Sequence, residues 1–202
     1  MLAPDKKGAE ESGATLVFLD ESGFSERPSV RRTWAPVGQT PIIRHHFNWK
    51  RLGAIGAIAC KPDGSGARLL LHLEPGSIVK ETIVEFLVAL HQEIDGPVVL
   101  IWDGLPAHRS KIVKEHTDQQ DWLTVERFPA YAPELNPVEY LWSSVKGKDV
   151  ANLCSDALWQ VEQKVRQAAC RIESEPRIVK GSLLASKLYY ERTLVRSCAE
   201  SQ

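Results

Sequence analysis

The apolar run at residues 98–102, Val-Val-Leu-Ile-Trp, is the feature that most constrains the fold of this chain. Five consecutive apolar residues without polar alternation are typical of a strand that is buried on both faces, as in the middle of a mostly parallel sheet. Asp103 follows the run directly, and Gly104 and Pro106 end it. Open α/β sheets bind ligands at the carboxyl ends of their strands. Asp103 is therefore either a ligand-binding carboxylate or a residue that caps the following turn.

The composition is that of an ordinary globular protein. The 202 residues are 43% hydrophobic and 25% charged, which is enough for one sizeable core and predicts one domain. The four cysteines are far apart and form no C-x-x-C pair, which argues against a zinc knuckle or a disulfide framework and fits a reducing cytoplasm. No apolar run approaches the length of a membrane span. The net charge of -1 gives no general sign of nucleic-acid binding.

Residues 27–51 differ from the rest of the chain, because they contain six Lys or Arg residues and no Asp or Glu. Tryptophan and histidine side chains are interleaved with the cations. Such a stretch is usually a solvated loop, but this combination also suits phosphate contacts together with stacking on bases. The predicted DNA-binding residues are Arg27, Arg31, Arg32, Trp34, Arg44, His45, Trp49, Lys50 and Arg51, together with Lys146.

Hydrophobic periodicity and turn signals predict an α/β chain with one mixed sheet flanked by helices. We expect a polar tail over residues 1–13 and one domain over 14–202, with C-terminal helices from about 151. The expected strands are 15–20, 51–60, 67–73, 98–103 and 122–128, the last near a sheet edge. The expected helices are about 78–94, 110–119, one that begins at 137, one from 158 to about 172, and 183–195.

Three acidic residues occupy positions from which they could converge. Asp20 and Asp103 each end a strand, and Glu139 lies in the first turn of the helix that Asn136 and Pro137 begin. If the first and fourth strands are parallel neighbours, both aspartates emerge at the same edge of the sheet. Converging carboxylates repel one another unless a cation joins them. Two Mg²⁺ ions held by carboxylates are a common solution for phosphodiester chemistry, so we predict a catalytic, metal-binding triad.

Each of these residues also has a structural interpretation. Asn136-x-x-Glu139 is the pattern of a capping box, in which Glu139 would bond to the backbone. Asp20 could be a solvated strand end, although it shares strand parity with Leu16 and Phe18 and would point inward if that face is buried. His108 could simply begin the next helix, or it could position a phosphate or a metal-bound water.

Three segments of the sequence match a known family. FLDESGF around Asp20, IWDGLPAH around Asp103 and PELNPVEYLW around Glu139 resemble the catalytic blocks of DDE transposases in the mariner-like superfamily, specifically the bacterial insertion sequence 630 group. Glu139 lies 36 positions after Asp103, close to the spacing such families use. The segment RTWAPVGQTP also resembles this group, and the similarity covers roughly residues 15–150. One departure is Gly104, where many relatives have asparagine.

The resemblance implies an RNase H-like fold and a site in which Asp20, Asp103 and Glu139 bind two Mg²⁺ ions, with Mn²⁺ as a substitute. His108 and Asn136 would be supporting residues. The implied activity is DNA cleavage at the ends of an insertion sequence, followed by attack of the freed 3′-hydroxyl on target DNA. The implied partners are transposon-end and target DNA and a second copy of the chain. Relatives also carry helix-turn-helix modules, which here would come from a separate frame or be missing from a truncated remnant.

Other functions are compatible with parts of this pattern. Another RNase H-like nuclease would share the metal site but lack strand transfer. A decayed transposase could persist as a DNA-binding or regulatory protein, although intact carboxylates argue against decay. A glycosidase needs only two carboxylates and would leave the Arg- and Trp-rich stretch unexplained.

Overall fold

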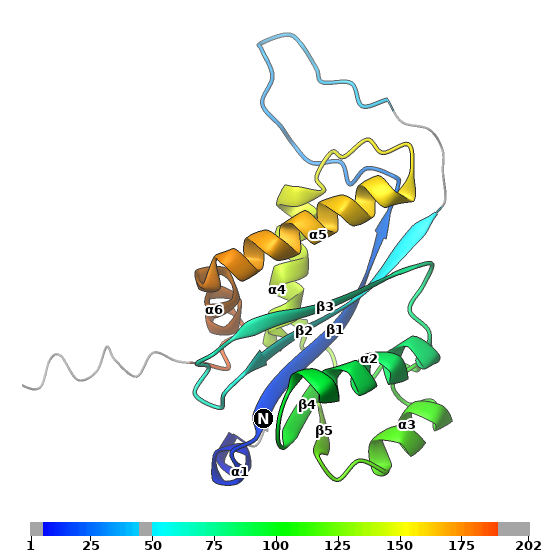
Figure 1. Ribbon diagram of the computed structural model, residues 1–202. Coiled ribbons are helices and arrows are strands. Elements are labelled where there is room, and N and C mark those ends of the chain that lie inside the picture. Colours follow the sequence, from blue (N-terminus) through cyan, green and yellow to red (C-terminus); the bar gives the residue numbers. More distant parts are fainter. Residues whose placement is uncertain (1–5, 45–49, 190–202) are drawn as a thin grey trace, which may run out of the picture.

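The computed structural model describes residues 6–44 and 50–189 and contains one five-stranded sheet (Figure 1). The strand order is β3-β2-β1-β4-β5, with β1 antiparallel to β2 and parallel to β4. This mixed sheet, with its parallel first and fourth strands, confirms the expected topology. The strands are β1 (Thr15–Ser25), β2 (Arg51–Cys60), β3 (Arg68–Pro75), β4 (Val98–Trp102) and β5 (Leu123–Arg127).

Strand β1 organises the sheet because both of its faces are buried. Leu16 and Phe18 belong to one hydrophobic cluster, whereas Val17 and Leu19 belong to a second cluster on the opposite face. Successive side chains of a strand alternate between faces, so this segment must be apolar at every position. The β1 strand pairs with β2 from Leu16 to Ser25, but its pairing with β4 ends at Phe18. The end of β1 therefore extends past its neighbour.

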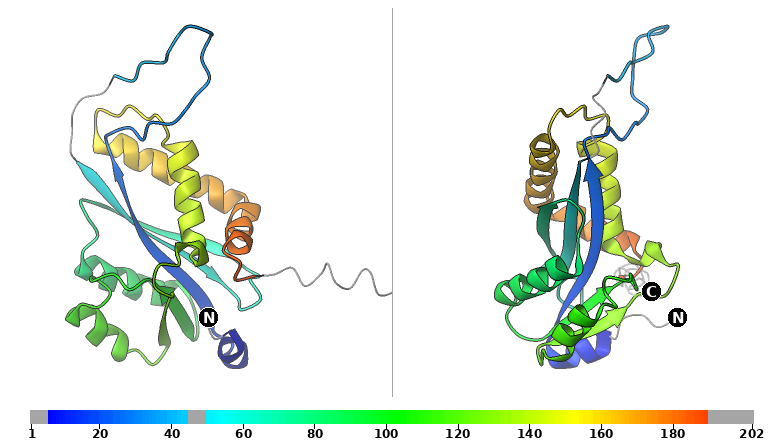
Figure 2. Two further views of the ribbon diagram at one scale, coloured as in Figure 1. Left: turned by 180° about the vertical axis from the view of Figure 1, so that it is seen from behind. Right: turned by 90° about the vertical axis from the view of Figure 1, so that its right-hand side faces the viewer.

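Helices cover both faces of this sheet. The first cluster unites α4, α5 and α6 with β1, and the second unites α2 and α3 with β1 and β4. Figure 2 shows α2 and α4 on opposite sides of β1. The remaining elements are α1 (Lys6–Ser12), α2 (Lys80–Glu93), α3 (Lys111–Asp118), the 3₁₀ turn η1 (Pro133–Leu135), α4 (Pro137–Ser144), the π-helical turn η2 (Val145–Asp149), α5 (Leu158–Ser174) and α6 (Pro176–Ala185).

Several elements differ in extent from the sequence expectation. The β1 strand continues to Ser25, since pairing with β2 supports the polar residues beyond the apolar run. The expected polar tail contains the short helix α1, which buries Ala9. The helix expected at 183–195 is wrong in position, because α6 begins at Pro176 and ends at Ala185; residues 190–195 lie outside the described part. Proline suits the first position of a helix, and Val179 and Leu183 then share its buried face.

Strand β5 lies at the sheet edge, as its alternating sequence predicts. Within the described residues, 6–44 and 50–189, no helix has the length and apolar character that a membrane span requires.

Candidate active site

The parallel pairing of β1 and β4 places two of the predicted carboxylates at the same edge. Leu16 pairs with Val99, and Phe18 pairs with Ile101. Two residues beyond the Phe18–Ile101 pair, the same register brings Asp20 and Asp103 opposite each other. Asp20 and Asp103 each lie two residues after a member of the α4-side cluster, Phe18 and Ile101, so strand alternation directs their side chains to the face that α4 covers.

Helix α4 supplies the third carboxylate, Glu139. The Asn136 side chain accepts a hydrogen bond from the backbone N–H of Val138 at 3.0 Å, which caps the helix. The backbone N–H of Asn136 itself donates to the carbonyl oxygen of Pro133 at 3.0 Å. In a capping box, that N–H would donate to Glu139 instead. The capping interpretation of Glu139 therefore does not hold, and its exposed carboxylate is available to the neighbouring cleft.

A glycine allows α4 to lie this close to the sheet. Gly56 pairs with Asp20 across the β1–β2 ladder. A Cβ atom at Gly56 would lie only 2.5 Å from Cζ2 of Trp142, so the indole ring occupies the space that a side chain would fill. This contact seats the buried face of α4 directly beside Asp20.

Asp20, Asp103 and Glu139 line one cleft of about 820 Å³. Asp20 is only 7% exposed, and among the described residues none donates a hydrogen bond to its Oδ2 atom. Burial, followed by the charges of Glu139, Glu21 and Asp103, raises the pKa of Asp20 to about 8, and only Trp142 acts in the opposite direction. Burial and the neighbouring carboxylates thus disfavour the charged form of Asp20 in this cluster. The other lining residues are Gly104, Leu105, Pro106, Arg109, Arg127, Phe128, Pro129, Ala130, Tyr131, Ala132, Pro133 and Asn136.

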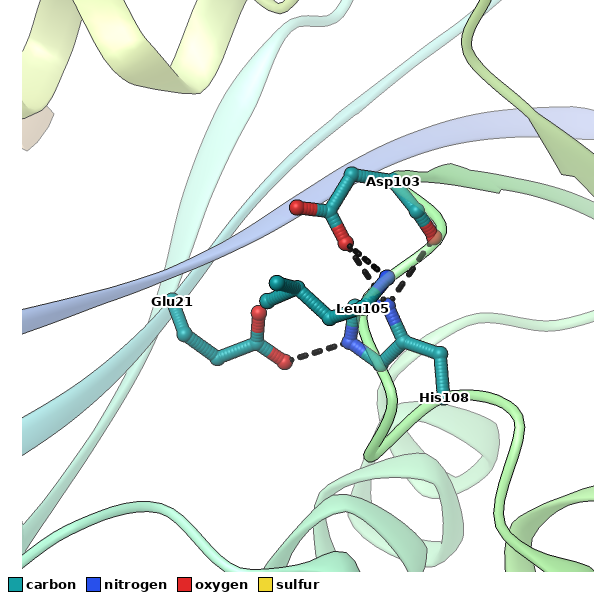
Figure 3. Close-up of polar contacts among 4 residues, drawn as sticks. All are labelled: Glu21, Asp103, Leu105 and His108. Carbon is teal, nitrogen blue, oxygen red and sulfur yellow. Dashed lines mark hydrogen bonds and ion pairs between the residues drawn. The ribbon is translucent and has the colours of Figure 1, made fainter. Parts of the chain in front are cut away.

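His108, the expected supporting residue, does not itself line this cleft but lies directly behind Asp103. Its side chain is fully buried and stacks on Trp102 with ring centroids 4.2 Å apart. Its Nε2 atom lies 2.7 Å from Oε1 of Glu21, and its Nδ1 atom lies 2.9 Å from Oδ1 of Asp103 (Figure 3). Burial opposes the charged ring, but the hydrogen bond and charge of Glu21, with Asp103, outweigh it and raise the pKa of His108.

Several residues at this site were not predicted from the sequence. Glu21 and Trp142 lie within the segments FLDESGF and PELNPVEYLW, but neither was assigned a role. Arg109 and Arg127 bring positive charge to the cleft lining, and Tyr131 is fully exposed there with a φ of 59°. Arg127 could have been found, because it ends a strand parallel to β4 and so lies at the carboxyl edge of the sheet.

None of the predicted DNA-binding residues that the structure describes lines the cleft. Residues 26–44, which follow β1, extend beyond the ends of β1 and β2 as a long loop (Figure 1). Trp34 in this loop is 99% exposed. Lys146, in η2, is partly buried and has its Nζ atom 5.6 Å from the ring centroid of Phe24. Arg27, Arg31, Arg32, Arg44, Lys50 and Arg51 are exposed, whereas His45 and Trp49 lie outside the described residues.

A family model described as DDE superfamily endonuclease matches residues 15–155, well over half of the chain. The chain therefore belongs to the DDE superfamily endonucleases, which confirms the resemblance drawn from the three sequence blocks. None of the curated proteins compared with the chain matches it.

Solved structures of Mos1 mariner transposase share the fold. A pre-cleavage Mos1 transpososome is 16% identical with a TM-score of 0.56, and the match covers 92% of this chain and 60% of that one. A Mos1 mariner paired end complex with Mn is 18% identical with a TM-score of 0.54, covering 87% and 56%. The Mos1 catalytic domain with Raltegravir and Mg is 16% identical with a TM-score of 0.51, covering 92% and 91%. The chain thus spans 56% of the Mos1 chain in the paired end complex and corresponds in fold to its catalytic domain. This confirms the expected RNase H-like fold.

Proposed function

We propose that this protein is the catalytic domain of a DNA transposase that cleaves insertion-sequence ends and joins them to target DNA in a reaction that requires divalent metal ions. The single observation that carries this proposal is the state of Asp20. The residue is only 7% exposed, has an Oδ2 atom without a donor among the described residues, and lies beside two further acids of the same cleft. The charged form of so deeply buried a carboxylate needs a partner, and a divalent cation supplies one.

The donor set fits Mg²⁺, which prefers carboxylate oxygens and keeps several waters. Asp20, Asp103 and Glu139 would hold the ions, which we propose to be two, with Mn²⁺ as a substitute. Bound in this way, a pair of divalent ions neutralises the charge that develops on the attacking and leaving oxygens of a phosphodiester.

The chain's own residues position this reaction. Asn136 fixes the first turn of α4 and therefore the direction of Glu139. Arg109 and Arg127 supply cations beside the carboxylates, where they can contact phosphates that flank the scissile bond. Tyr131, exposed at the same cleft, offers a surface on which a base can stack. In-line phosphoryl transfer depends mainly on such positioning and charge neutralisation.

DNA is the proposed partner, and the loop between β1 and β2 would bind it outside the cleft. We also propose a homodimer in the DNA complex, because joining two transposon ends requires two catalytic sites. The Mos1 paired end complex and the Mos1 strand transfer complex, which share the fold, support both points by analogy. We also propose that a helix-turn-helix segment takes part in recognising the ends.

The substitution Asp103→Asn tests the proposal. The variant should fold normally, since the amide keeps the shape of the side chain, but it should lose at least about 100-fold in cleavage, as expected when charge stabilisation is removed from a catalytic site. The measurement is Mg²⁺- or Mn²⁺-dependent nicking of a plasmid that carries the DNA flanking this gene. Asp118→Asn, on the exposed end of α3, is the matched control. Equal nicking by Asp103→Asn and wild type would refute the assignment, and nicking without end joining would indicate a nuclease instead.

A further inference from the structure

The buried contact between Glu21 and His108 has no role in the function proposed above. Glu21 directly follows Asp20 in β1, but it lies on the opposite face of the sheet, with Val17 and Leu19. Its Oε1 atom is 2.7 Å from Nε2 of His108, in the connection between β4 and α3. The His108 side chain has no exposed surface and that of Glu21 is 13% exposed, so water contributes little to this contact.

His108 connects Glu21 to Asp103. Its Nδ1 atom lies 2.9 Å from Oδ1 of Asp103 and 3.0 Å from the backbone oxygen of the same residue. The ring is held flat against Trp102, with an interplanar angle of 3°. With one face stacked and both nitrogens bonded, the imidazole has a single orientation. Figure 3 shows the ring between the two carboxylates.

The Asp103 carboxylate is fixed through one of its two oxygens. The backbone N–H of Leu105 donates to Oδ1 at 3.0 Å, and the His108 ring approaches the same atom. Within residues 6–44 and 50–189, these contacts engage Oδ1 and leave Oδ2 for the cleft that Asp103 lines. The direction in which Asp103 presents its free oxygen therefore depends on the position of the His108 ring.

We infer that Glu21 is a positioning residue, which holds Asp103 in its working orientation through the His108 ring. This inference rests on the proposed function, because it assigns Glu21 a part in the same carboxylate site. Without Glu21, the buried Nε2 atom of His108 loses its acceptor, and the ring no longer has a fixed orientation. Partners of this kind, which bond to a metal-binding group rather than to the metal, typically change affinity or activity by about 10- to 100-fold when removed.

A competing interpretation is that Glu21 binds the metal itself. Glu21, Asp103 and His108 each offer one atom, and these atoms lie within 4.8 Å of one another. The positioning role is favoured because Nε2 and Nδ1 of His108 both already contact carboxylate oxygens at hydrogen-bonding distance. A ligand role requires the negative charge of Glu21, whereas a positioning role requires only its hydrogen-bond acceptor.

The variants Glu21→Ala and Glu21→Gln separate these roles in the full chain. Glu21→Ala should lower kcat for Mn²⁺-dependent plasmid nicking by about 10- to 100-fold with KM for DNA unchanged. It should weaken Mn²⁺ binding, measured by calorimetry, while the number of bound ions stays the same. Glu21→Gln keeps an oxygen acceptor at the same length and should recover most of both quantities. Glu115→Ala removes an exposed carboxylate of α3 and should match wild type.

The ¹⁵N resonances of the His108 ring provide a readout that does not depend on catalysis. They should shift in Glu21→Ala and stay close to wild type in Glu21→Gln. The inference is overturned if Glu21→Ala keeps full kcat and Mn²⁺ affinity, if Glu21→Gln is as impaired as Glu21→Ala, or if either variant loses a bound ion. Asp103→Asn, measured in parallel, separates the two proposals. An active Asp103→Asn defeats the proposed function, whereas an inactive Asp103→Asn beside an unimpaired Glu21→Ala defeats only the role of Glu21.

Discussion

At the scale of single residues, the site combines one carboxylate that is deeply buried with two that are more accessible. Ionisation of Asp20 is the least favourable of the three, because β1 and α4 bury its carboxyl group, whereas Glu139 is exposed. The sequence predicted this inward direction from the shared parity of Asp20 with Leu16 and Phe18. It could not predict that Glu21, on the other face, reaches His108, because that contact depends on the path of the loop after β4.

The buried Asp20 makes the stability of the metal-free protein depend on pH. Its pKa is about 8 in the folded protein and near 3.8 without the fold. The folded state therefore holds an extra proton between these values, and stability falls as the pH rises from about 4 through 8. Asp20→Asn removes the buried charge and should raise the free energy of unfolding at pH 9 by about 2–5 kcal/mol, with a much smaller effect near pH 4.

Urea unfolding of wild type and Asp20→Asn at pH 5 and pH 9 in a chelator measures this effect. Added Mg²⁺ should stabilise wild type at pH 9 but not the variant, since the ion replaces the proton on Asp20. Asp118→Asn, at an exposed carboxylate, should keep the pH dependence of wild type. If Asp20→Asn also kept it, Asp20 would not be the group that causes the loss of stability.

At the scale of elements, the site depends on how closely α4 approaches β2. The N-terminal signals of α4 were readable in sequence, because Asn136, Pro137 and the buried positions that follow are local features. The role of Gly56 in the packing of α4 could not be predicted from the sequence, because a glycine in a strand does not indicate which distant side chain packs against it. The beginning of α6 was misplaced for a related reason, since Pro176 suits either the end of one helix or the first turn of the next.

Gly56→Ala should disrupt the packing of α4 against β2, because the added methyl group would collide with Trp142. The added Cβ would lie 2.5 Å from Cζ2 and 2.8 Å from Cη2 of Trp142, a ring that is only 4% exposed. Overpacking of this kind costs about 1–3 kcal/mol of stability. Because α4 carries Glu139, we also expect a loss of nicking activity at temperatures where the variant is still folded.

Chemical denaturation and plasmid nicking test this expectation together. Gly23→Ala is the matched control on the same ladder, because nothing lies within 4 Å of the Cβ it would add. It should remain within about 1 kcal/mol of wild type. Trp142→Phe combined with Gly56→Ala should recover part of the lost stability, since the smaller ring relieves the contact. If Gly56→Ala resembled Gly23→Ala, the Trp142 contact would not be what limits the approach of α4.

At the scale of the whole molecule, acidic groups gather at the cleft and basic groups gather on the loop that follows β1. Three carboxylates line the cleft beside Arg109 and Arg127, while the loop that extends beyond the end of β1 carries Arg27, Arg31, Arg32 and Arg44 (Figure 1). A net charge of -1 conceals this separation. The fold class and strand pairing followed from the sequence because buried strands, their polar ends and the turns between them are encoded locally. The path of the basic loop could not be predicted from the sequence, because few of the described residues in this loop are buried against the domain.

The loop is anchored to the domain by backbone contacts rather than by its cations. The backbone N–H of Arg31 donates to Oδ1 of Asn152 at 2.7 Å, and the N–H of Asn152 donates to the carbonyl oxygen of Ser29 at 3.0 Å. The side chains of Arg31 and Arg32 are exposed, so removing them should leave the fold intact. If they contact phosphates, the double variant Arg31→Ala, Arg32→Ala should bind DNA less tightly and release fewer counterions. Each lost phosphate contact lowers the slope of log Kd against log salt by about 0.9, so we expect a decrease of up to about 2.

Fluorescence anisotropy with a labelled duplex between 50 and 200 mM salt, about the range over which such contacts are lost, gives both affinity and slope. Lys164→Ala with Lys180→Ala removes two exposed cations from α5 and α6 and is the control for net charge alone. An equal decrease in slope for the two double variants would mean that overall charge, not the loop, sets DNA affinity. A decrease confined to the loop variant would show that Arg31 and Arg32 themselves contact phosphates of the duplex.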